Sequence, residues 1–292
     1  MERPGEVVAL EPVDARPEAD VPRGRVLGLE ACNALDGAGE RQLRALEQKL
    51  SCQQGAIQLA LREDTFRARH GSPSYSPPMP LERDELDRYA EEHTSAPEPL
   101  LAELAAETQA NLPSPQMLTG TVEGRFLELL VYASGAKRVL EIGMYSGYSA
   151  LSMAAGLTEG GRIDTCEIEE RHAEVARRYI ERSPYADRIQ IHMGPALESI
   201  ERLEGDFDFV FIDADKPNYL NYYEAVLPRL GERGFIAADN TLWSGRVLEE
   251  GGDESTLAIK EFNDRVKSDP RVTAVMLTVR DGVTLIRPKG GS

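Results

Sequence analysis

From Met117 onward the chain alternates between short apolar segments and longer segments with helical spacing. The short segments have the length and composition of buried strands, and they are Arg138–Gly143, Arg162–Ile168, Arg188–Met193, Phe207–Asp213 and Gly234–Asp239. Helical patterns fit Val122–Ser134, a segment that ends at Leu157, Glu170–Ser183, Pro195–Leu203, Tyr219–Leu230 and Ser255–Ser268. Strands that alternate with helices form right-handed βαβ units around a parallel sheet. The pattern therefore predicts an α/β fold.

The last part of the chain has a different pattern. Two strand-like segments, Val272–Val279 and Val283–Arg287, flank Arg280-Asp281-Gly282. Because Asp-Gly is typical of a hairpin turn, we expect these two strands to be antiparallel. The full prediction is a mostly parallel seven-stranded sheet with an antiparallel C-terminal hairpin at its edge and helices on both faces.

The residues before Met117 are less regular. Residues 1 to about 36 are rich in Pro, Gly and acids, which predicts disorder, whereas the leucine spacing from Gly39 to about Ala68 fits one or two amphipathic helices. Four prolines in His70–Pro80 indicate a linker. Helical patterns resume at Leu86–His93 and at Pro99–Ala110. We expect an N-terminal extension over residues 1–80 and a globular domain over residues 81–292.

Composition excludes several classes of function. The net charge is −17 and the isoelectric point is near 4.8, so a broad basic face for nucleic acid is not expected. No apolar segment approaches the roughly 18 residues that a membrane span needs. The acidic N-terminus has no apolar core of a signal peptide, which favours the cytoplasm. The prediction is a cytoplasmic protein without nucleic-acid or membrane partners.

Polar side chains follow two of the expected strands directly. Asp213, Asp215 and Lys216 come after one strand, and Asp239 and Asn240 come after the next. Ligands of an open α/β sheet bind at the carboxyl ends of its strands. The oxygens of Asp213, Asp239 and Asn240 therefore suit a hard cation, with Mg²⁺ favoured and Ca²⁺ or Mn²⁺ as alternatives. Lys216 is a candidate base.

A plainer interpretation of the same residues stays open. Asp and Asn often cap helices and form turns, and lysines are usually solvated surface residues. Either strand-end motif alone favours this plainer interpretation. The glycine-containing loop that follows the first strand, Glu141-Ile-Gly143-Met-Tyr145-Ser-Gly147-Tyr-Ser149, favours a binding site.

Glycines in this loop let the backbone turn tightly and approach a ligand. The spacing of Gly143 and Gly147 lacks the second and third glycines of the dinucleotide fingerprint. Glu141 would repel a phosphate and suits a cationic ligand. Glu167 ends the next strand, where a carboxylate can accept hydrogen bonds from a ribose diol. S-adenosylmethionine (SAM) has a ribose and a sulfonium cation but no phosphate, so it is the predicted cofactor, although an ordinary strand-to-helix turn is the alternative.

A series of motifs between about Leu86 and Arg287 resembles a known family. They are Met117-Leu-Thr119, Glu123-Gly, Ala136-Lys-Arg-Val-Leu-Glu-Ile-Gly143, Gly147-Tyr-Ser-Ala150, Gly194-Pro-Ala196, Phe211-Ile-Asp-Ala-Asp-Lys216, Asn218-Tyr, Asp239-Asn-Thr-Leu-Trp243 and Asp281-Gly. In this order they are similar to the cation-dependent O-methyltransferases, the caffeoyl-CoA and catechol group of class I SAM methyltransferases. The resemblance implies a Rossmann-like fold and transfer of a methyl group to a hydroxyl.

The resemblance also implies roles for single residues. Asp213, Asp239 and Asn240 match the metal ligands, and Lys216 matches the general base, so Asp213 and Lys216 are the expected catalytic residues. The positions that match contacts to the cofactor, together with two more residues of the same loop, are Thr119, Glu141, Gly143, Met144, Tyr145, Ser149, Glu167, Ala196 and Asp215.

The expected acceptor is a small molecule with vicinal oxygens, a catechol or a cyclic ene-diol. Ser244 stands where the plant enzymes of the family have Asn, which weakens the case for a caffeoyl-CoA-type ester, the alternative acceptor. Segments Gly143–Met153, Glu181–Pro184 and Val279–Arg287 look like the O-methyltransferases of mycosporine (4-deoxygadusol) biosynthesis. A protein or nucleic-acid methyltransferase is disfavoured by the metal triad and the acidic charge. The expected assembly is a homodimer.

Overall fold

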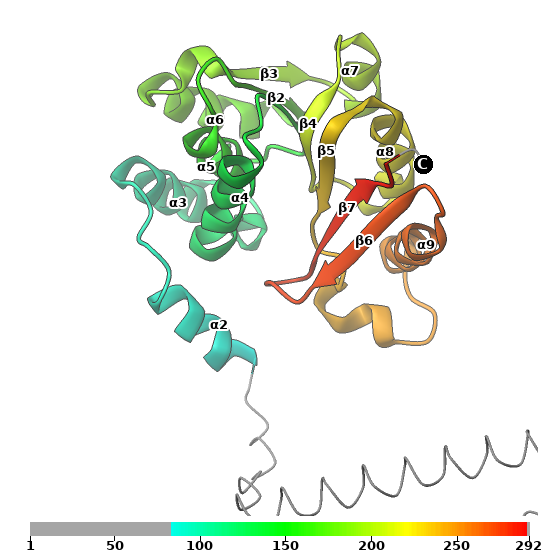
Figure 1. The fold of residues 1–292 in the computed structure, drawn as a ribbon. Helices are drawn as coiled ribbons and strands as arrows, with labels where there is room; N and C mark the ends of the chain where they lie inside the picture. The colour runs from blue at the N-terminus through cyan, green and yellow to red at the C-terminus, as the bar shows by residue number, and fades with distance from the viewer. Residues whose placement is uncertain (1–82, 291–292) are drawn as a thin grey trace, which may run out of the picture. The chain divides into compact units, whose positions relative to one another are not determined.

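The computed structural model describes residues 83–290, which lie within one unit of the chain, Pro80–Ser292 (Figure 1). The expected extension over residues 1–80, with its helices between Gly39 and Ala68, falls outside the described residues. The family-like motifs between Leu86 and Arg287 all fall inside them.

A seven-stranded sheet forms the centre of this unit, with the strand order β3-β2-β1-β4-β5-β7-β6 (Figure 1). The strands are β1 Arg138–Ile142, β2 Arg162–Glu167, β3 Ile189–Met193, β4 Phe207–Ile212, β5 Leu230–Ala238, β6 Val272–Leu277 and β7 Val283–Pro288. Strands β1 to β5 pair in parallel, whereas β7 is antiparallel to both β5 and β6. The predicted parallel sheet with an antiparallel C-terminal hairpin at its edge is confirmed.

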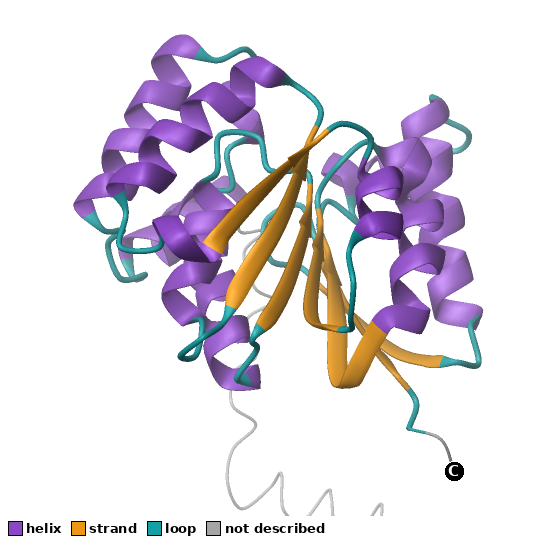
Figure 2. Cartoon of the chain, turned by 90° about the horizontal axis from the view of Figure 1, so that it is seen from above, coloured by secondary structure: helices purple, strands orange, loops and turns teal. Residues whose placement is uncertain are grey.

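Helices cover both faces of the sheet, as Figure 2 shows in a view from above. They are α2 Arg83–Glu92, α3 Pro99–Asn111, α4 Gly120–Ser134, α5 Tyr148–Gly156, α6 Glu170–Arg182, α7 Ala196–Arg202, α8 Tyr219–Val226 and α9 Glu254–Ser268. Within residues 83–290, no helix is long and apolar enough to cross a membrane.

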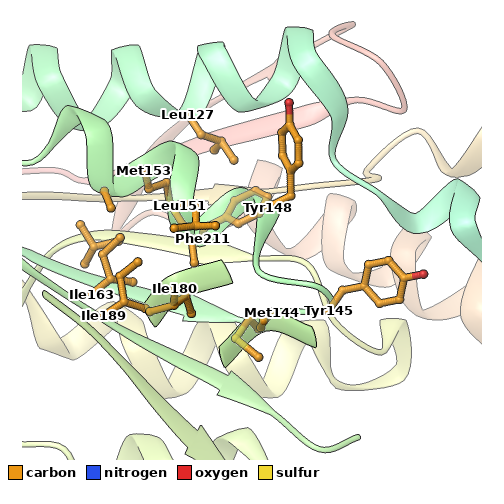
Figure 3. Packing of buried hydrophobic residues seen from close by; sticks show 14 of the residues in the cluster. Leu127, Met144, Tyr145, Tyr148, Leu151, Met153, Ile163, Ile180, Ile189 and Phe211 are labelled. Carbon is orange, nitrogen blue, oxygen red and sulfur yellow. The ribbon is translucent and has the colours of Figure 1, made fainter. Parts of the chain in front are cut away.

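Strand β4 shows why both faces are covered. Successive side chains of a strand point to opposite faces. Phe209 and Phe211 therefore pack in one apolar cluster with α4, α5 and α6, whereas Val210 and Ile212 pack in a second cluster with α8 and α9. Figure 3 shows part of the first cluster, where Phe211 lies among residues of α4 and α5. A strand with apolar side chains on both faces is typical of a parallel sheet between two helical layers.

The prediction of a helix over Tyr219–Leu230 is wrong at the C-terminal end of the helix. Helix α8 ends at Val226, a short 3₁₀ turn follows over Leu227–Arg229, and Leu230 is already the first residue of β5. Pro228 has no N–H group to donate to the preceding turn of an α-helix, so the helix cannot continue through it. Strand β5 begins earlier than expected because Leu230 pairs with Phe207 ahead of a register shift in β4.

The strand order reverses between β1 and β4, and this is where an open α/β sheet binds its ligands. The loop after β1 passes very close to the end of β4 here. A Cβ atom on Gly143, whose φ is +95°, would lie 2.0 Å from the carbonyl oxygen of Asp213. Only glycine fits this approach. The backbone N–H of Asp213 also donates to the carbonyl of Ile142 at 2.9 Å, so the ends of β1 and β4 are joined.

Candidate active site

The proposed metal ligands lie at the ends of two neighbouring strands. Asp213 directly follows β4, and Asp239 and Asn240 directly follow β5. The Nζ atom of Lys216 donates hydrogen bonds to Oδ1 of Asp213 at 3.1 Å and to Oδ1 of Asn240 at 2.7 Å. The Nδ2 atom of Asn240 donates to Oδ2 of Asp239 at 3.0 Å. The fold therefore brings together four of the five residues that follow the two strands, namely Asp213, Lys216, Asp239 and Asn240.

Asp239 has an unusual environment for a carboxylate. The residue is 4% exposed, and its Oδ1 atom is buried without a hydrogen-bond partner. Burial, with the charge of Asp213 as the next cause, raises the pKa of Asp239 to about 7. A cation at this oxygen would relieve both the missing hydrogen bond and the repulsion between the two acids.

The donor set fits a hard cation by its chemistry. It consists of two carboxylates and one amide, and these oxygens suit Mg²⁺, Mn²⁺ or Ca²⁺. In residues 83–290 no cluster of three or more His, Cys, Asp and Glu side chains is arranged as a metal site. The candidate set has only two members of those residue types, so its third ligand would have to be the Asn240 amide.

The loop that carries Asn240 has a strained backbone. Asn240, Trp243 and Ser244 have φ values of 55°, 48° and 52°. Asn adopts this left-handed conformation more readily than most residues, but for Trp it costs on the order of 1 kcal/mol or more. Such strain persists only where surrounding contacts hold the backbone, and it is common at functional sites.

The turn of the β6–β7 hairpin holds this loop. The carbonyl of Gly282 accepts from the N–H of Thr241 at 3.0 Å, and Asp281 accepts from the N–H groups of Leu242 and Ser244 at 2.9 and 2.5 Å. A Cβ on Gly282 would lie 2.5 Å from Cγ of Leu242, so glycine is needed for the contact. The sequence predicted only a turn at Asp281-Gly282. This turn also holds the loop that contains Asn240, a role that depends on tertiary contacts.

Lys216 begins a short 3₁₀ turn, Lys216–Asn218, and its side chain is only 8% exposed. Besides the two candidate metal ligands, its Nζ donates to the hydroxyl of Tyr219 at 2.7 Å. The ammonium group lies 4.6 Å from the ring centre of Tyr219 and 5.5 Å from the ring of Trp243. The alternative that Lys216 is a solvated surface lysine is therefore wrong. Its role as a base stays a prediction.

Glu141, near the end of β1, is one of the residues expected to bind the cofactor. It is fully buried, and its carboxyl accepts hydrogen bonds from Oγ1 of Thr165 at 2.5 Å and from the Ser149 side chain. Burial raises the pKa of Glu141 to about 8. Its Oε1 atom has no partner, and neither does the buried hydroxyl of Ser146 in the same loop. Unpartnered polar atoms of this kind fit the cationic and polar groups of SAM.

Ser146 is a residue that the sequence did not single out. Its position between Gly143 and Gly147 was the available signal, but the burial of its hydroxyl depends on the packing of α5 and α6 around the loop. Figure 3 shows Met144 and Tyr145 of this loop, which belong to the first apolar cluster.

Glu167 ends β2, and backbone groups already occupy most of its carboxylate. The N–H of Tyr145 donates to Oε2 at 2.7 Å, and the N–H groups of Ile168 and Glu169 donate to Oε1 at 2.9 and 2.8 Å. A carboxylate has about four lone-pair sites. Three are used in this way, which leaves room for a further hydrogen bond. That Glu167 binds the ribose stays a prediction.

The other expected cofactor residues come from different elements around the same edge of the sheet. Thr119 immediately precedes α4, and Ala196 is the first residue of α7. The carboxylate of Asp215 accepts from Asn218 Nδ2 and from the Tyr222 hydroxyl, both at 2.5 Å. These bonds are the local turn contacts that the plainer interpretation of the motif expected, so a cofactor contact of Asp215 also stays a prediction.

Glu123 is a further acid at the site, and the sequence assigned it no role. Glu123 lies on α4 and is 2% exposed. Its carboxyl group lies within hydrogen-bond distance of the Asp239 carboxyl group. Burial, together with the charges of Asp239 and Asp213, raises the pKa of Glu123 well above its usual range. Arg280, in the turn of the β6–β7 hairpin, places Nη1 3.6 Å from Glu123 Oε2.

Comparison with known proteins identifies the family. The model of the O-methyltransferase family matches residues 91–289. The chain belongs to this family. A caffeoyl-CoA O-methyltransferase from Eucalyptus gunnii is 35% identical over 224 residues, which cover 71% of this chain and 88% of that protein.

Two solved structures support the same assignment. The O-methyltransferase from Bacillus cereus in complex with SAH is 34% identical, with a TM-score of 0.65 over 70% of this chain and 97% of that one. The SAH-bound methyltransferase PaMTH1 from Podospora anserina is 29% identical, with a TM-score of 0.67 over 72% and 98%. The protein is thus a SAM-dependent O-methyltransferase with a Rossmann-like fold, as the sequence predicted. The closer likeness to the mycosporine enzymes stays a prediction.

Cofactor affinity of this O-methyltransferase is expected to depend on pH through Glu141. The carboxyl is protonated below about pH 8, and it must ionise to pair with a cationic ligand. Each unit below pH 8 should therefore weaken SAM binding by up to about tenfold, and the affinity should level off above pH 8. Calorimetric titration of SAM from pH 6 to 9 measures the slope. Glu141→Gln should remove it, and a slope that persists in this variant would assign the proton to another group.

Proposed function

We propose that the enzyme is cation-dependent and methylates one of two adjacent oxygens of a small molecule, a catechol or a cyclic ene-diol. The observation that carries this proposal is the convergence of Asp213, Asp239 and Asn240 at neighbouring strand ends. A hard cation with three protein ligands keeps further positions for a bidentate acceptor. When bound, such a cation lowers the pKa of a coordinated hydroxyl and fixes its orientation.

The residues of the chain supply the other parts of this reaction. Lys216 lies within hydrogen-bond distance of two of the three candidate ligands, so its neutral amine form is proposed to take the proton of the acceptor hydroxyl. Glu141 and the Gly143 loop would hold the SAM cation at the adjacent end of β1. Bound SAM would supply the methyl group to the acceptor oxygen, and its sulfur would leave as a neutral thioether. Correct alignment of the two reactants can contribute about 7–11 kcal/mol to such a step.

A comparison of matched acceptors tests the proposal. With Mg²⁺ present, a catechol should have a kcat/KM at least about a hundredfold higher than the corresponding mono-phenol, because a single hydroxyl loses the orientation that chelation gives. Removal of Mg²⁺ with a chelator should abolish the difference, and its return should restore it. Equal values for the two acceptors with Mg²⁺ present would contradict the proposed mechanism.

A caffeoyl-CoA-type ester is a second candidate acceptor, and the identity to the Eucalyptus gunnii enzyme favours it. Ser244, in place of the Asn of the plant enzymes, speaks against it. The net charge of −17 also gives little help to the phosphates of coenzyme A. The ratio of kcat/KM for caffeoyl-CoA to that for free caffeic acid decides between an ester and a free acceptor. Cytoplasmic location, the homodimer and the extension over residues 1–80 stay predictions from the sequence.

A further inference from the structure

Two buried carboxyl groups, those of Glu123 and Asp239, lie within hydrogen-bond distance of each other, and one oxygen of each has no hydrogen-bond partner. Oε1 of Glu123 and Oδ1 of Asp239 are both buried, and neither has a hydrogen-bond partner. They come from separate parts of the fold, the first turn of α4 and the end of β5. A buried polar atom without a hydrogen bond is destabilising, so a pair of them at one place needs an explanation.

The positive charges near this pair do not balance it. Lys216 directs its hydrogen bonds to Asp213, Asn240 and Tyr219. Within residues 83–290, Arg280 is the one cationic side chain that lies within 4 Å of Glu123. Its Nη1 stands 3.6 Å from Glu123, and the Arg280 side chain is 38% exposed, so water screens the attraction.

We propose that Glu123 is a third acidic group of the cation site, and that it lies outside the set of direct ligands and holds the cation through a bound water molecule. This inference rests on the proposed function and adds a residue to the same site. Asp213, Asp239 and Glu123 do not form a ready three-acid site. Glu123 therefore acts through its charge and through a hydrogen bond to a water ligand, as carboxylates around metal sites commonly do.

A purely structural role for Glu123 makes a different prediction. Arg280 joins the hairpin turn to the start of α4, because its Nη1 donates to the carbonyl of Leu118 at 3.3 Å and faces Glu123. If Glu123 served only this bridge, loss of either partner would disturb the site alike. If Glu123 acts on a cation, the two substitutions should have different effects on the cation affinity, because one removes a negative charge and the other a positive charge.

Titration calorimetry of the full-length protein with Mn²⁺ separates the two roles without a measurement of activity. Glu123→Gln, which keeps the size of the side chain, should weaken Mn²⁺ binding at least tenfold. Arg280→Gln should leave the affinity unchanged or increase it. Glu128→Gln is the matched control, since Glu128 lies on the same helix and pairs with Arg125 at the surface. The Glu128→Gln variant should bind Mn²⁺ with the same affinity as the unmodified protein.

Several results would overturn the inference. They are a loss of Mn²⁺ affinity in Glu123→Gln that is smaller than tenfold, or any loss of Mn²⁺ affinity in Arg280→Gln. Circular dichroism checks the fold of each variant. If Glu123→Gln does not fold, Glu123→Asp replaces it in the test, because it keeps the charge. The Mn²⁺ affinity of Glu123→Asp should then be within about fivefold of that of the unmodified protein. A larger loss of affinity in Glu123→Asp, or any loss in Arg280→Gln, overturns the proposal. No Mn²⁺ binding by the unmodified protein would instead contradict the proposed function itself.

Discussion

Replacement of Asp213 by alanine is expected to lower kcat/KM by at least about a thousandfold and to leave the fold intact. A cation that loses a ligand at this site would give up several kcal/mol of transition-state stabilisation, and about 4 kcal/mol corresponds to a factor of a thousand. The fold should persist because the Asp213 side chain is 26% exposed, and the bond between its backbone N–H and Ile142 does not involve the side chain.

Two measurements check this prediction together. Kinetics with saturating Mg²⁺ give the loss of kcat/KM, and titration with Mn²⁺ shows whether the loss follows from weaker cation binding. Asp206→Ala is the matched control, since Asp206 is an exposed acid just before the opposite end of the same strand. Full activity of Asp213→Ala in the presence of excess chelator would exclude both the ligand role and the dependence on a cation.

The positions of these acids could be predicted because they follow from local pattern and from a general rule. Apolar segments such as Phe207–Ile212 have the length of buried strands, and parallel strands end at the same edge of the sheet. Asp213 and Asp239 therefore had to lie near each other if the strands paired. The predicted end of α8 was too late because the pattern of apolar residues continues into Leu230, although Pro228 was a sequence signal that the helix ends before it.

Other features of the site depend on contacts between distant segments, which no local pattern reveals. Glu123 is one of 50 acidic residues in the chain, and only the packing of α4 against the sheet makes it a buried one. Asp281-Gly282 is a turn signal in any hairpin, but here the turn also holds the strained loop of Asn240. Lys216 likewise differs from other lysines through its three hydrogen-bond partners rather than through its neighbours in the sequence.

The second large effect is expected when Lys216 is replaced. Lys216→Met should lower kcat by about 10²–10⁴, the usual contribution of a positioned acid or base, because the acceptor hydroxyl loses its proposed proton acceptor. Mn²⁺ binding should not weaken. The Nζ atom donates to Asp213 and Asn240, so its removal frees two oxygens and takes away a positive charge. Lys216→Met should thus separate activity from cation affinity, whereas Asp213→Ala should lose both.

Two further variants complete this test. Lys216→Arg keeps the positive charge but cannot act as a base near neutral pH, so its kcat should stay close to that of Lys216→Met if proton transfer is the role of the lysine. Lys289→Met, at an exposed position, should match the unmodified enzyme. Recovery of kcat in Lys216→Arg would instead assign Lys216 an electrostatic role. A kcat of Lys216→Met within about twofold of normal would exclude this side chain from the chemical step, and the proton of the acceptor would then have to pass to solvent or to another group at the strand ends.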